Sequence, residues 1–416
     1  MDTDRTIVHT RASCRLCGSR DLVNILSFGE TPLANAYLTG ADLHNPEVFA
    51  PLVVNFCTTC ALVQLRDVVD PAVLFSRYLY LSGTSPVFRA HFANYACSVW
   101  KRFDLSTASF VVDVGSNEGV LLAEFKQRGA RILGIDPAVN VASEATRNGI
   151  PTIAKFFDRD AAEGIRLEHG YANVITANNV FAHTDDVEEF TLAVKALLAT
   201  DGVFIVEVQY LKDLIERNLF DIIYHEHLCY YHVTPLVRFF DRLGLRLFDV
   251  ETVETHGGSI RLYVGRQDGP HAREPRVDDV VRAEGPLNER GTYEAFAARI
   301  AANKTRLVAM LADIKRSGGR IVGYGAPAKA TTLCYAFGID SALLDCVVDD
   351  DARIKQGLFM PGTHLPIRPP RVLYDESPGY CLILAWNFAG PIMKAHERFA
   401  SLGGRFIVPV PQPQLI

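Results

Sequence analysis

FVVDVGSNEG, residues 110–119, is the stretch of sequence that decides the fold. Its first half is apolar apart from one aspartate and favours a buried strand, and its two glycines predict a tight turn. VLLAEF, residues 120–125, follows directly and favours a helix. A strand, a glycine turn and a helix N-terminus together form a binding site for an anionic or polar group of a ligand.

The next predicted strand, residues 130–136, ends on Asp136, which lies 21 residues after Gly115. In nucleoside-binding βαβ units, a carboxylate at this distance binds the ribose hydroxyls. The turn does not contain GxGxxG, the fingerprint of NAD-binding proteins. Instead, DVGSNEG, residues 113–119, is similar to the DxGxGxG motif of class I S-adenosylmethionine (SAM) methyltransferases, with Asn117 in place of the middle glycine.

Polar residues follow a further predicted strand of the same unit. Strands are predicted over residues 171–177 and 202–208, and strands that alternate with helices are typical of a parallel α/β sheet. NNVFAH, residues 178–183, follows the first of them. Ligands of open α/β folds bind at the carboxyl edge of the sheet, so we expect Asn178 and His183 to lie there.

The densest polar cluster of the chain is YHEHLCYYH, residues 224–232. It is not the HExxH motif of zinc proteases, because no histidine lies three residues after Glu226. Metal binding by its three histidines, His225, His227 and His232, would need a spacing that no common metal site uses. A general base with an orienting carboxylate and a phenolic partner explains the cluster better.

Two cysteine pairs near the N-terminus predict a zinc site. CRLC, residues 14–17, and CTTC, residues 57–60, are each followed by a small residue, and two such turns can present four thiolates to one tetrahedral ion. A redox role would favour a single pair at a helix start, so we expect a structural zinc ion. Its expected ligands are Cys14, Cys17, Cys57 and Cys60. The other five cysteines are expected to be small core residues: Cys97, Cys229, Cys334, Cys346 and Cys381.

The last quarter of the chain predicts a second, Rossmann-like α/β unit. Gly323, Gly325 and Ala328 match GxGxxG/A, and strands are predicted over residues 343–350, 380–386 and 405–409. One interpretation is that Gly323, Gly325 and Lys329 hold the nucleotide or pyrophosphate of a substrate, and another is that the unit binds NAD(P) for a ketoreduction. The predicted organisation is a zinc module (1–70), a bridging segment (71–107), a methyltransferase domain (108–266), a helical connector (267–318) and a C-terminal domain (319–416).

Composition excludes several classes of partner. A chain of 416 residues suggests two or three domains, and 49% hydrophobic with 22% charged residues is ordinary for a globular protein. The net charge of −6 provides no basic field for nucleic acid or anionic lipid. The polar N-terminus and the absence of a long apolar run lead us to expect a cytoplasmic protein with no membrane partner.

The motifs in their order resemble the zinc-containing sugar C-methyltransferases. The order is CxxC, CxxC, YLYLSGTS (78–85), DVGSNEG, NNVFAH and YHEH, and it covers nearly the whole chain. The resemblance implies SAM-dependent methylation of a nucleotide-linked, usually dTDP-linked, 4-keto-deoxysugar in the biosynthesis of natural-product sugars such as those of antibiotics. It favours carbon 3, next to the ketone, while carbon 5 is equally adjacent and stays open. A non-catalytic sugar-nucleotide binding protein would not need the YHEH cluster.

The resemblance also implies roles for individual residues. His227 would be the base that forms an enolate, Tyr224 and Glu226 would orient it or pass its proton onward, and His183 would donate to the enolate oxygen. Tyr78 resembles a second active-site tyrosine. The expected SAM-binding residues are Asp113, Gly115, Asn117, Gly119, Asp136 and Asn178. We expect the chain to be a monomer, because no heptad stretch or long apolar face requires a partner.

Overall fold

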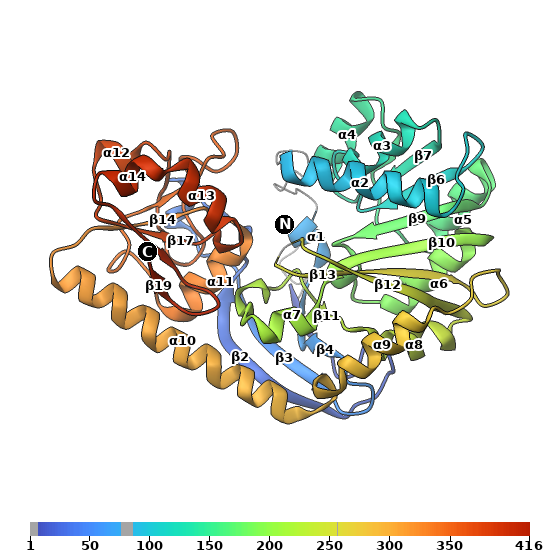
Figure 1. The fold of residues 1–416 in the computed structure, drawn as a ribbon, viewed down its shortest axis with the longest axis horizontal. Helices are drawn as coiled ribbons and strands as arrows, with labels where there is room; N and C mark the ends of the chain where they lie inside the picture. The colour runs from blue at the N-terminus through green and yellow to red at the C-terminus, as the bar shows by residue number, and fades with distance from the viewer. Residues whose placement is uncertain (1–6, 76–85, 256) are drawn as a thin grey trace.

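The computed structural model describes residues 7–75, 86–255 and 257–416. Figure 1 shows an α/β unit on either side of the molecule, with the long N-terminal strands curving beneath and between them. The first unit is built on a seven-stranded sheet, the second on a six-stranded sheet, and the N-terminal strands form a four-stranded sheet. No helix within the described ranges is long and apolar enough to cross a membrane.

The middle unit has the fold of class I SAM methyltransferases, as the sequence predicted. Its strands have the order β12-β13-β10-β9-β6-β7-β8, in which β13 is antiparallel to both of its neighbours. Figure 1 shows helices covering both faces of this sheet. The strands are β6 (Phe110–Val114), β7 (Arg131–Ile135), β8 (Thr152–Ile153), β9 (Ala172–Asn178), β10 (Leu198–Gln209), β12 (Leu245–Val253) and β13 (Ser259–Arg266). The helices include α3 (Val120–Gln127), α4 (Val139–Arg147), α5 (Arg159–His169), α6 (Val187–Leu197) and α8 (Val233–Arg242).

The N-terminal sheet takes one strand from the middle of the chain. Its order is β11-β4-β3-β2, where β11 (Cys229–Tyr230) pairs with β4 (Val63–Leu65), beside β3 (Phe49–Cys57) and β2 (Leu22–Pro32). A single residue, Leu228, separates the segment YHEH from β11. That segment is therefore held by the N-terminal sheet, which the chain position alone did not indicate. The remaining N-terminal elements are β1 (Val8–Thr10), β5 (Asp67–Val69) and α1 (Pro71–Phe75).

The C-terminal unit is built on a second sheet with a Rossmann-like order, β16-β15-β14-β17-β18-β19, which is parallel except for the edge strand β19, antiparallel to β18. Helices occupy most of the segment that leads into it, and the 27-residue α10 buries an apolar stripe that includes Phe296, Leu307 and Leu311. The strands are β14 (Ile321–Tyr324), β15 (Val347–Val348), β16 (Ile367–Arg368), β17 (Tyr380–Ile383), β18 (Arg405–Val408) and β19 (Gln414–Leu415). Helices α7 (Leu211–Glu216) and α9 (Pro275–Ala283) precede this unit, and α9 packs against α8 and β12 of the middle unit. The helices that follow are α10 (Arg290–Arg316), α11 (Ala328–Phe337), α12 (Val372–Asp375), α13 (Ala389–Ala395) and α14 (Glu397–Ser401).

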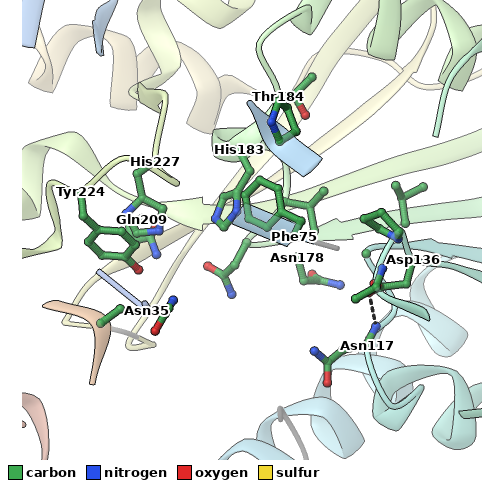
Figure 2. Close-up of a pocket in the computed structure, with 18 of the residues that line it drawn as sticks. Asn35, Phe75, Asn117, Asp136, Asn178, His183, Thr184, Gln209, Tyr224 and His227 are labelled. Carbon is green, nitrogen blue, oxygen red and sulfur yellow. Dashed lines mark hydrogen bonds between the residues drawn. The ribbon is translucent and has the colours of Figure 1, made fainter. Parts of the chain in front are cut away.

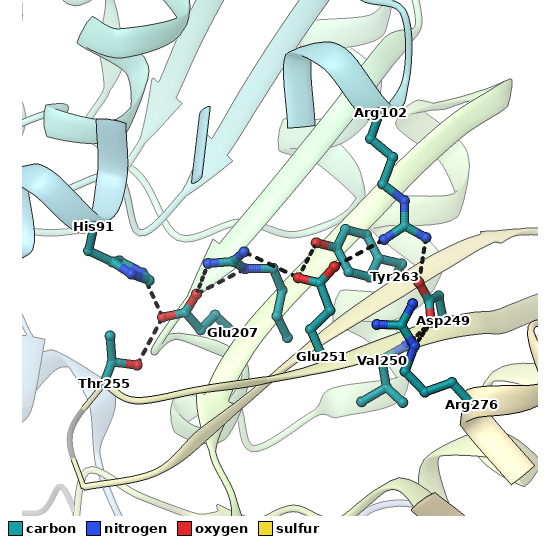
Figure 3. Close-up of polar contacts among 10 residues, drawn as sticks. His91, Arg102, Glu207, Asp249, Val250, Glu251, Thr255, Tyr263 and Arg276 are labelled. Atoms are coloured by element: carbon teal, nitrogen blue, oxygen red, sulfur yellow. Dashed lines mark hydrogen bonds and ion pairs between the residues drawn. The ribbon is translucent and has the colours of Figure 1, made fainter. Parts of the chain in front are cut away.

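Ion pairs fasten helix α2 (Pro86–Arg102) to the methyltransferase sheet (Figure 3). Near the start of the helix, His91 lies 3.0 Å from the carboxylate of Glu207, which also binds Arg261 at 2.8 Å. Burial would raise the pKa of Glu207, but His91 and Arg261 outweigh burial and lower it to about 2. At the end of the helix, Arg102 pairs with Asp249. The helix is thus held at both ends by carboxylates of the sheet.

Candidate active site

All three units contribute to one large cavity of about 540 Å³. Figure 2 shows Asp136 and Asn117 on one side, Tyr224 and Asn35 on the other, and His183 and Asn178 between them. Its lining includes Asn35 and Tyr37 of the N-terminal unit, Asp136 and His183 of the middle unit, and Lys329 and Asn387 of the C-terminal unit. A ligand that filled this cavity would contact residues of all three units.

The glycine turn after β6 forms one end of the cavity. Gly115 has φ +67°, and an added Cβ would lie 2.2 Å from a methyl group of Val180, so only glycine fits there. Asn117 has φ +50°, a conformation that asparagine tolerates better than most residues. This explains how asparagine can replace the middle glycine of the motif.

Asp136 joins this turn to the end of β7. Its Oδ2 accepts from the backbone N–H of Asn117 and its Oδ1 from that of Ala138, each at 2.9 Å. Burial raises the pKa of Asp136, and the two backbone donors oppose that effect. Each carboxylate oxygen keeps a second lone pair, so the side chain can still accept from two ribose hydroxyls.

The other predicted cofactor residues lie at different distances from the cavity. Asn178 lines it, and its Oδ1 is buried without a hydrogen bond to any described residue. Gly119 has φ +75° and is the N-cap of α3. Asp113 is not among the residues that line the cavity; it accepts from Thr176 Oγ1 at 2.5 Å, and burial raises its pKa to about 7. Asp113 therefore ties the end of β6, just before the turn, to β9.

Two histidines face each other in the middle of the cavity. The rings of His183 and His227 have centroids 5.1 Å apart, and the ring of Tyr224 lies 4.2 Å from that of His227. His227 Nδ1 lies 2.6 Å from the carbonyl oxygen of Ile222, which can only accept. Nδ1 therefore carries the proton when the ring is neutral, and the lone pair that a general base needs is then on Nε2.

His183 is held as a neutral imidazole. Burial lowers its pKa well below the ordinary value, and His227 lowers it further. Its ring also lies 5.4 Å from the ring of Phe75 in α1. A neutral histidine can donate an N–H to a developing negative charge without holding a charge of its own beforehand.

Glu226 has a hydrogen-bond partner in the N-terminal unit. Its Oε1 accepts from Asn35 Nδ2 at 2.5 Å, and Asn35 lines the cavity. The carbonyl of Ile222 orients the His227 ring through Nδ1. The structure thus connects Glu226 with an amide of the N-terminal unit. The other predicted active-site residue, Tyr78, lies outside the described residues together with the rest of YLYLSGTS (78–85).

The residues that follow the glycine turn of the C-terminal unit, 327–329, line the cavity, whereas Gly323 and Gly325 are not among its lining residues. Of the three predicted residues, Lys329 lines the cavity, where its Nζ donates to Asn387 Oδ1 at 2.6 Å and lies 3.5 Å from the centre of the Trp386 ring. Gly323 lies within β14, packed against Leu384, and Gly325 has φ +87°. Burial lowers the pKa of Lys329 to about 8, and Asp221 opposes that effect.

Asp349 repeats in the C-terminal unit the arrangement found at Asp136. Its Oδ2 accepts from the backbone N–H of Ala326 at 2.6 Å, and its Oδ1 accepts from that of Asp351 at 2.8 Å. In both units an aspartate directly after the second strand accepts two backbone hydrogen bonds. One comes from the glycine turn, and the other comes from the residue two positions after the aspartate. Both turns are therefore built in the same way near the two ends of one cavity.

This repetition allows a matched test of the SAM-binding end. We expect Asp136→Asn to weaken binding of S-adenosylhomocysteine at least about tenfold, because an amide –NH2 would face a backbone N–H and one ribose contact would be lost. Asp349→Asn makes the same chemical change at the other turn and should leave that affinity unchanged. Isothermal titration calorimetry measures both. Equal affinities of Asp136→Asn and the wild type would contradict the assignment.

The four predicted zinc ligands converge. All four sulfurs lie within 4.8 Å of one another, as required of a tetrahedral S₄ site. In each knuckle the residue after the second cysteine has positive φ, +73° at Gly18 and +68° at Ala61, and its N–H donates to the carbonyl of the first cysteine. The knuckles are thus matched, and four thiolates would fill every position around a zinc ion. Of the other cysteines, Cys97 is half-buried, and Cys229, Cys334, Cys346 and Cys381 are buried.

His225 and His232 lie outside the cavity lining, although they belong to the same cluster as His227. His225 Nε2 is 3.1 Å from the carbonyl oxygen of Ala50. His232 is fully buried at the N-terminus of α8, and burial lowers its pKa to about 3. Both histidines are structural parts of the segment that carries His227.

The depressed pKa of His232 predicts a pH effect on stability. Below pH ~6.5 the unfolded chain binds a proton that the native chain refuses down to pH ~3, so stability falls with pH in that window. We expect the wild type to lose roughly 1 kcal/mol more than His232→Gln between pH ~7 and ~5.5. Urea unfolding measures this difference, with His44→Gln at an exposed position as the control. Identical pH dependence in all three chains would contradict it.

Sequence reasoning missed several residues of the cavity. Asn35 and Tyr37 come from a stretch without a motif, and Tyr37 donates to the carbonyl of Ala326 at 2.5 Å. Lys355 lines the C-terminal end, and Gln209 follows the predicted strand at 202–208. The position of Gln209 at the end of a parallel strand was the one signal that could have indicated a site residue.

Comparison with protein families assigns each part of the chain. A model described as a methyltransferase domain matches residues 88–250. A methyltransferase model described as a zinc binding domain matches residues 14–75, and one described as a C-methyltransferase C-terminal domain matches residues 254–411. With the fold and the cavity above, these matches define a SAM-dependent methyltransferase.

Similarity to a curated protein gives the family. The chain is 37% identical to the C-methyltransferase NovU of Streptomyces niveus over 413 residues, which cover 99% of this chain and 98% of that protein. The chain therefore belongs to the family of zinc-containing C-methyltransferases.

Solved structures are similar over less of the chain. A SAM-dependent methyltransferase from Clostridium acetobutylicum has 13% identity and a TM-score of 0.35, covering 44% of this chain and 92% of that one. The magnesium protoporphyrin IX methyltransferase of Synechocystis with bound SAM has 15% identity and a TM-score of 0.33, covering 43% and 81%.

Proposed function

We propose that the protein transfers a methyl group from SAM to the carbon next to the ketone of a dTDP-linked 4-keto-deoxysugar, with carbon 3 favoured. The observation that carries this proposal is the single cavity with two similarly built glycine turns near its ends and a histidine pair between them. One turn suits the nucleoside of SAM, and the other suits the nucleotide of the sugar. The product would serve the biosynthesis of deoxysugars such as those of antibiotics.

The base in this reaction is His227. A 4-keto group acidifies the proton on the adjacent carbon, and Nε2 of the neutral ring has the lone pair to remove it. The hydrogen bond from Nδ1 to Ile222 holds the ring in the required tautomer. Tyr224, whose ring lies against that of His227, keeps the base in place.

His183 is suited to the enolate that results. Its ring lies next to that of His227 in the cavity, so an N–H of the neutral imidazole can be directed at the developing oxyanion. When bound, SAM would supply an electrophilic methyl group: the enolate carbon would form the new C–C bond as the S–CH3 bond breaks, with S-adenosylhomocysteine as the leaving group. Since the expected zinc ligands are all cysteines of the N-terminal knuckles, the zinc ion takes no part in this chemistry.

The C-terminal end of the cavity suits a diphosphate. Lys329 and Lys355 line it, and Asn387 adds an amide. The pKa of Lys329, lowered to about 8, leaves this side chain mostly protonated near neutral pH, and a bound anion would raise the pKa further. These two cations are our reason to place the sugar nucleotide here.

A thermal-shift panel with S-adenosylhomocysteine, dTDP and NADPH, singly and in pairs, tests the proposal, because a ligand that binds the native state raises its stability. We expect the first two to stabilise the protein, and more so together. Stabilisation by NADPH without any from dTDP would instead favour the ketoreductase interpretation. A monomer in the cytoplasm remains our expectation for the enzyme at work.

A further inference from the structure

One arginine lies inside the first zinc knuckle and points away from the metal site. Arg15 is flanked by Cys14 and Leu16, and its side chain is 0% exposed. A charge buried so completely needs partners that are themselves fixed. Its backbone N–H also donates to Gln64 Oε1 at 2.9 Å, so the knuckle is tied to β4.

The guanidinium of Arg15 binds two different segments. Its Nε donates to Asp185 Oδ1 at 3.0 Å, and its Nη1 donates to the carbonyl oxygen of Leu65 at 2.7 Å. Asp185 lies two residues after His183 and lines the cavity. Arg15 therefore contacts the segment that carries the first histidine of the pair.

Leu65 connects the same arginine with the other histidine. Its N–H donates to the carbonyl of Leu228 at 2.9 Å, and Leu228 follows His227 directly. The N–H of Leu228 in turn donates to the carbonyl of Ala182 at 2.7 Å, next to His183. The segments of His183 and His227 are thus hydrogen-bonded to each other. Each of them also contains, or is hydrogen-bonded to, one of the two residues that the Arg15 guanidinium binds.

We propose that Arg15 is a positioning residue, which holds the segments of His183 and His227 in register through Asp185 and Leu65. Arginine suits this role because its planar fork can donate to two fixed acceptors at once. The zinc ion would then support the reaction indirectly, without touching a substrate, because it fixes the knuckle from which Arg15 extends. The proposal rests on the proposed function, because it takes these two histidines as the reacting pair.

The test is Arg15→Met, which keeps the length of the side chain and removes its donors. We expect kcat to fall at least about tenfold, as misplacement of reacting groups does, with the affinity for S-adenosylhomocysteine and the zinc content unchanged. In spectra of the protein with ¹³C-labelled histidine, the signals of His183 and His227 should shift. Wild-type kcat and wild-type histidine signals in folded, zinc-loaded Arg15→Met would overturn the proposal.

Arg11 provides a matched control. It binds the same carboxylate of Asp185, at 3.1 Å, while the Leu65 carbonyl is bound by Arg15. Arg11→Met should therefore reduce kcat less than Arg15→Met. An equal loss in both variants would show that the charge of Asp185 matters and the connection to Leu65 does not, which contradicts the proposal.

Two further variants decide the matter if Arg15→Met does not fold. Arg15→Lys keeps the charge, but its ammonium is a compact point donor that does not match both acceptors, and Asp185→Asn changes the contact from outside the knuckle. Wild-type kcat and histidine signals in both would overturn the proposal. The spectra need no substrate, so they test the role of Arg15 even if the wild type does not methylate the ketosugar. A wild type that fails to methylate the ketosugar would overturn the proposed function alone.

Discussion

His227→Asn is expected to reduce turnover roughly 10³-fold, the contribution of a well-placed general base. Asparagine places an amide N–H near the position of Nδ1, so the hydrogen bond to Ile222 can be kept while the basic Nε2 is removed. Affinity for S-adenosylhomocysteine should stay close to that of the wild type, because the cofactor turn around Asp136 belongs to a different part of the cavity. Steady-state kinetics and calorimetry measure the two quantities.

His225→Gln is the control for this prediction. His225 lies on the same segment but outside the cavity lining, and glutamine can keep the contact of Nε2 with Ala50. Its turnover should remain within about twofold of the wild type, since no transition-state contact is lost. A His227→Asn enzyme that turns over like the wild type would contradict the assignment of the base. Loss of cofactor binding in this variant would also count against the assignment, because it would indicate that His227 binds SAM.

Replacing one cysteine of each knuckle, Cys14→Ser with Cys57→Ser, should abolish zinc binding and destabilise the whole protein. Structural zinc sites contribute on the order of 10 kcal/mol to the folding of the domains that depend on them. Here the consequence extends further, because β4 of the zinc-bearing sheet pairs with β11, which begins one residue after the YHEH segment. We expect a fall in Tm of at least about 10 °C or aggregation on expression.

Elemental analysis and thermal unfolding measure this effect, with one zinc ion expected per wild-type chain. Cys97→Ser is the matched control, because Cys97 is half-buried in α2, on a separate element from the four-cysteine cluster. It should keep its zinc ion and its Tm. A zinc-free double variant with the Tm of the wild type would show that the metal does not stabilise the fold.

The elements predicted from local sequence patterns are those that the structure confirms most closely. The strand, turn and helix around DVGSNEG depend on residues within a short window, and β6, the turn at Gly115 and α3 occur where expected. The CxxC knuckles are equally local, and their four sulfurs meet. Asp136 could be placed because the spacing of a βαβ unit sets where its second strand ends.

Contacts between distant segments could not be predicted in this way. Asn35 reaches Glu226 across 191 residues, and no periodicity links the two. The role expected for Glu226 came from its place next to His227, and the sequence could not indicate that the backbone carbonyl of Ile222 also holds that ring. Gly323 matches a motif by spacing, but the strand continues through it, so the turn begins later than a count of residues suggests.

The transfer of a methyl group to carbon is the central claim, and NMR of the product tests it most directly. The enzyme would be incubated with SAM carrying a ¹³C-labelled methyl group and a dTDP-linked 4-keto-deoxysugar. The account predicts a labelled methyl group bonded to the ring carbon next to the ketone, at carbon 3. Label at carbon 5 would correct the position and leave the mechanism intact. Label on an oxygen, or no transfer while NADPH reduces the ketone, would contradict the account.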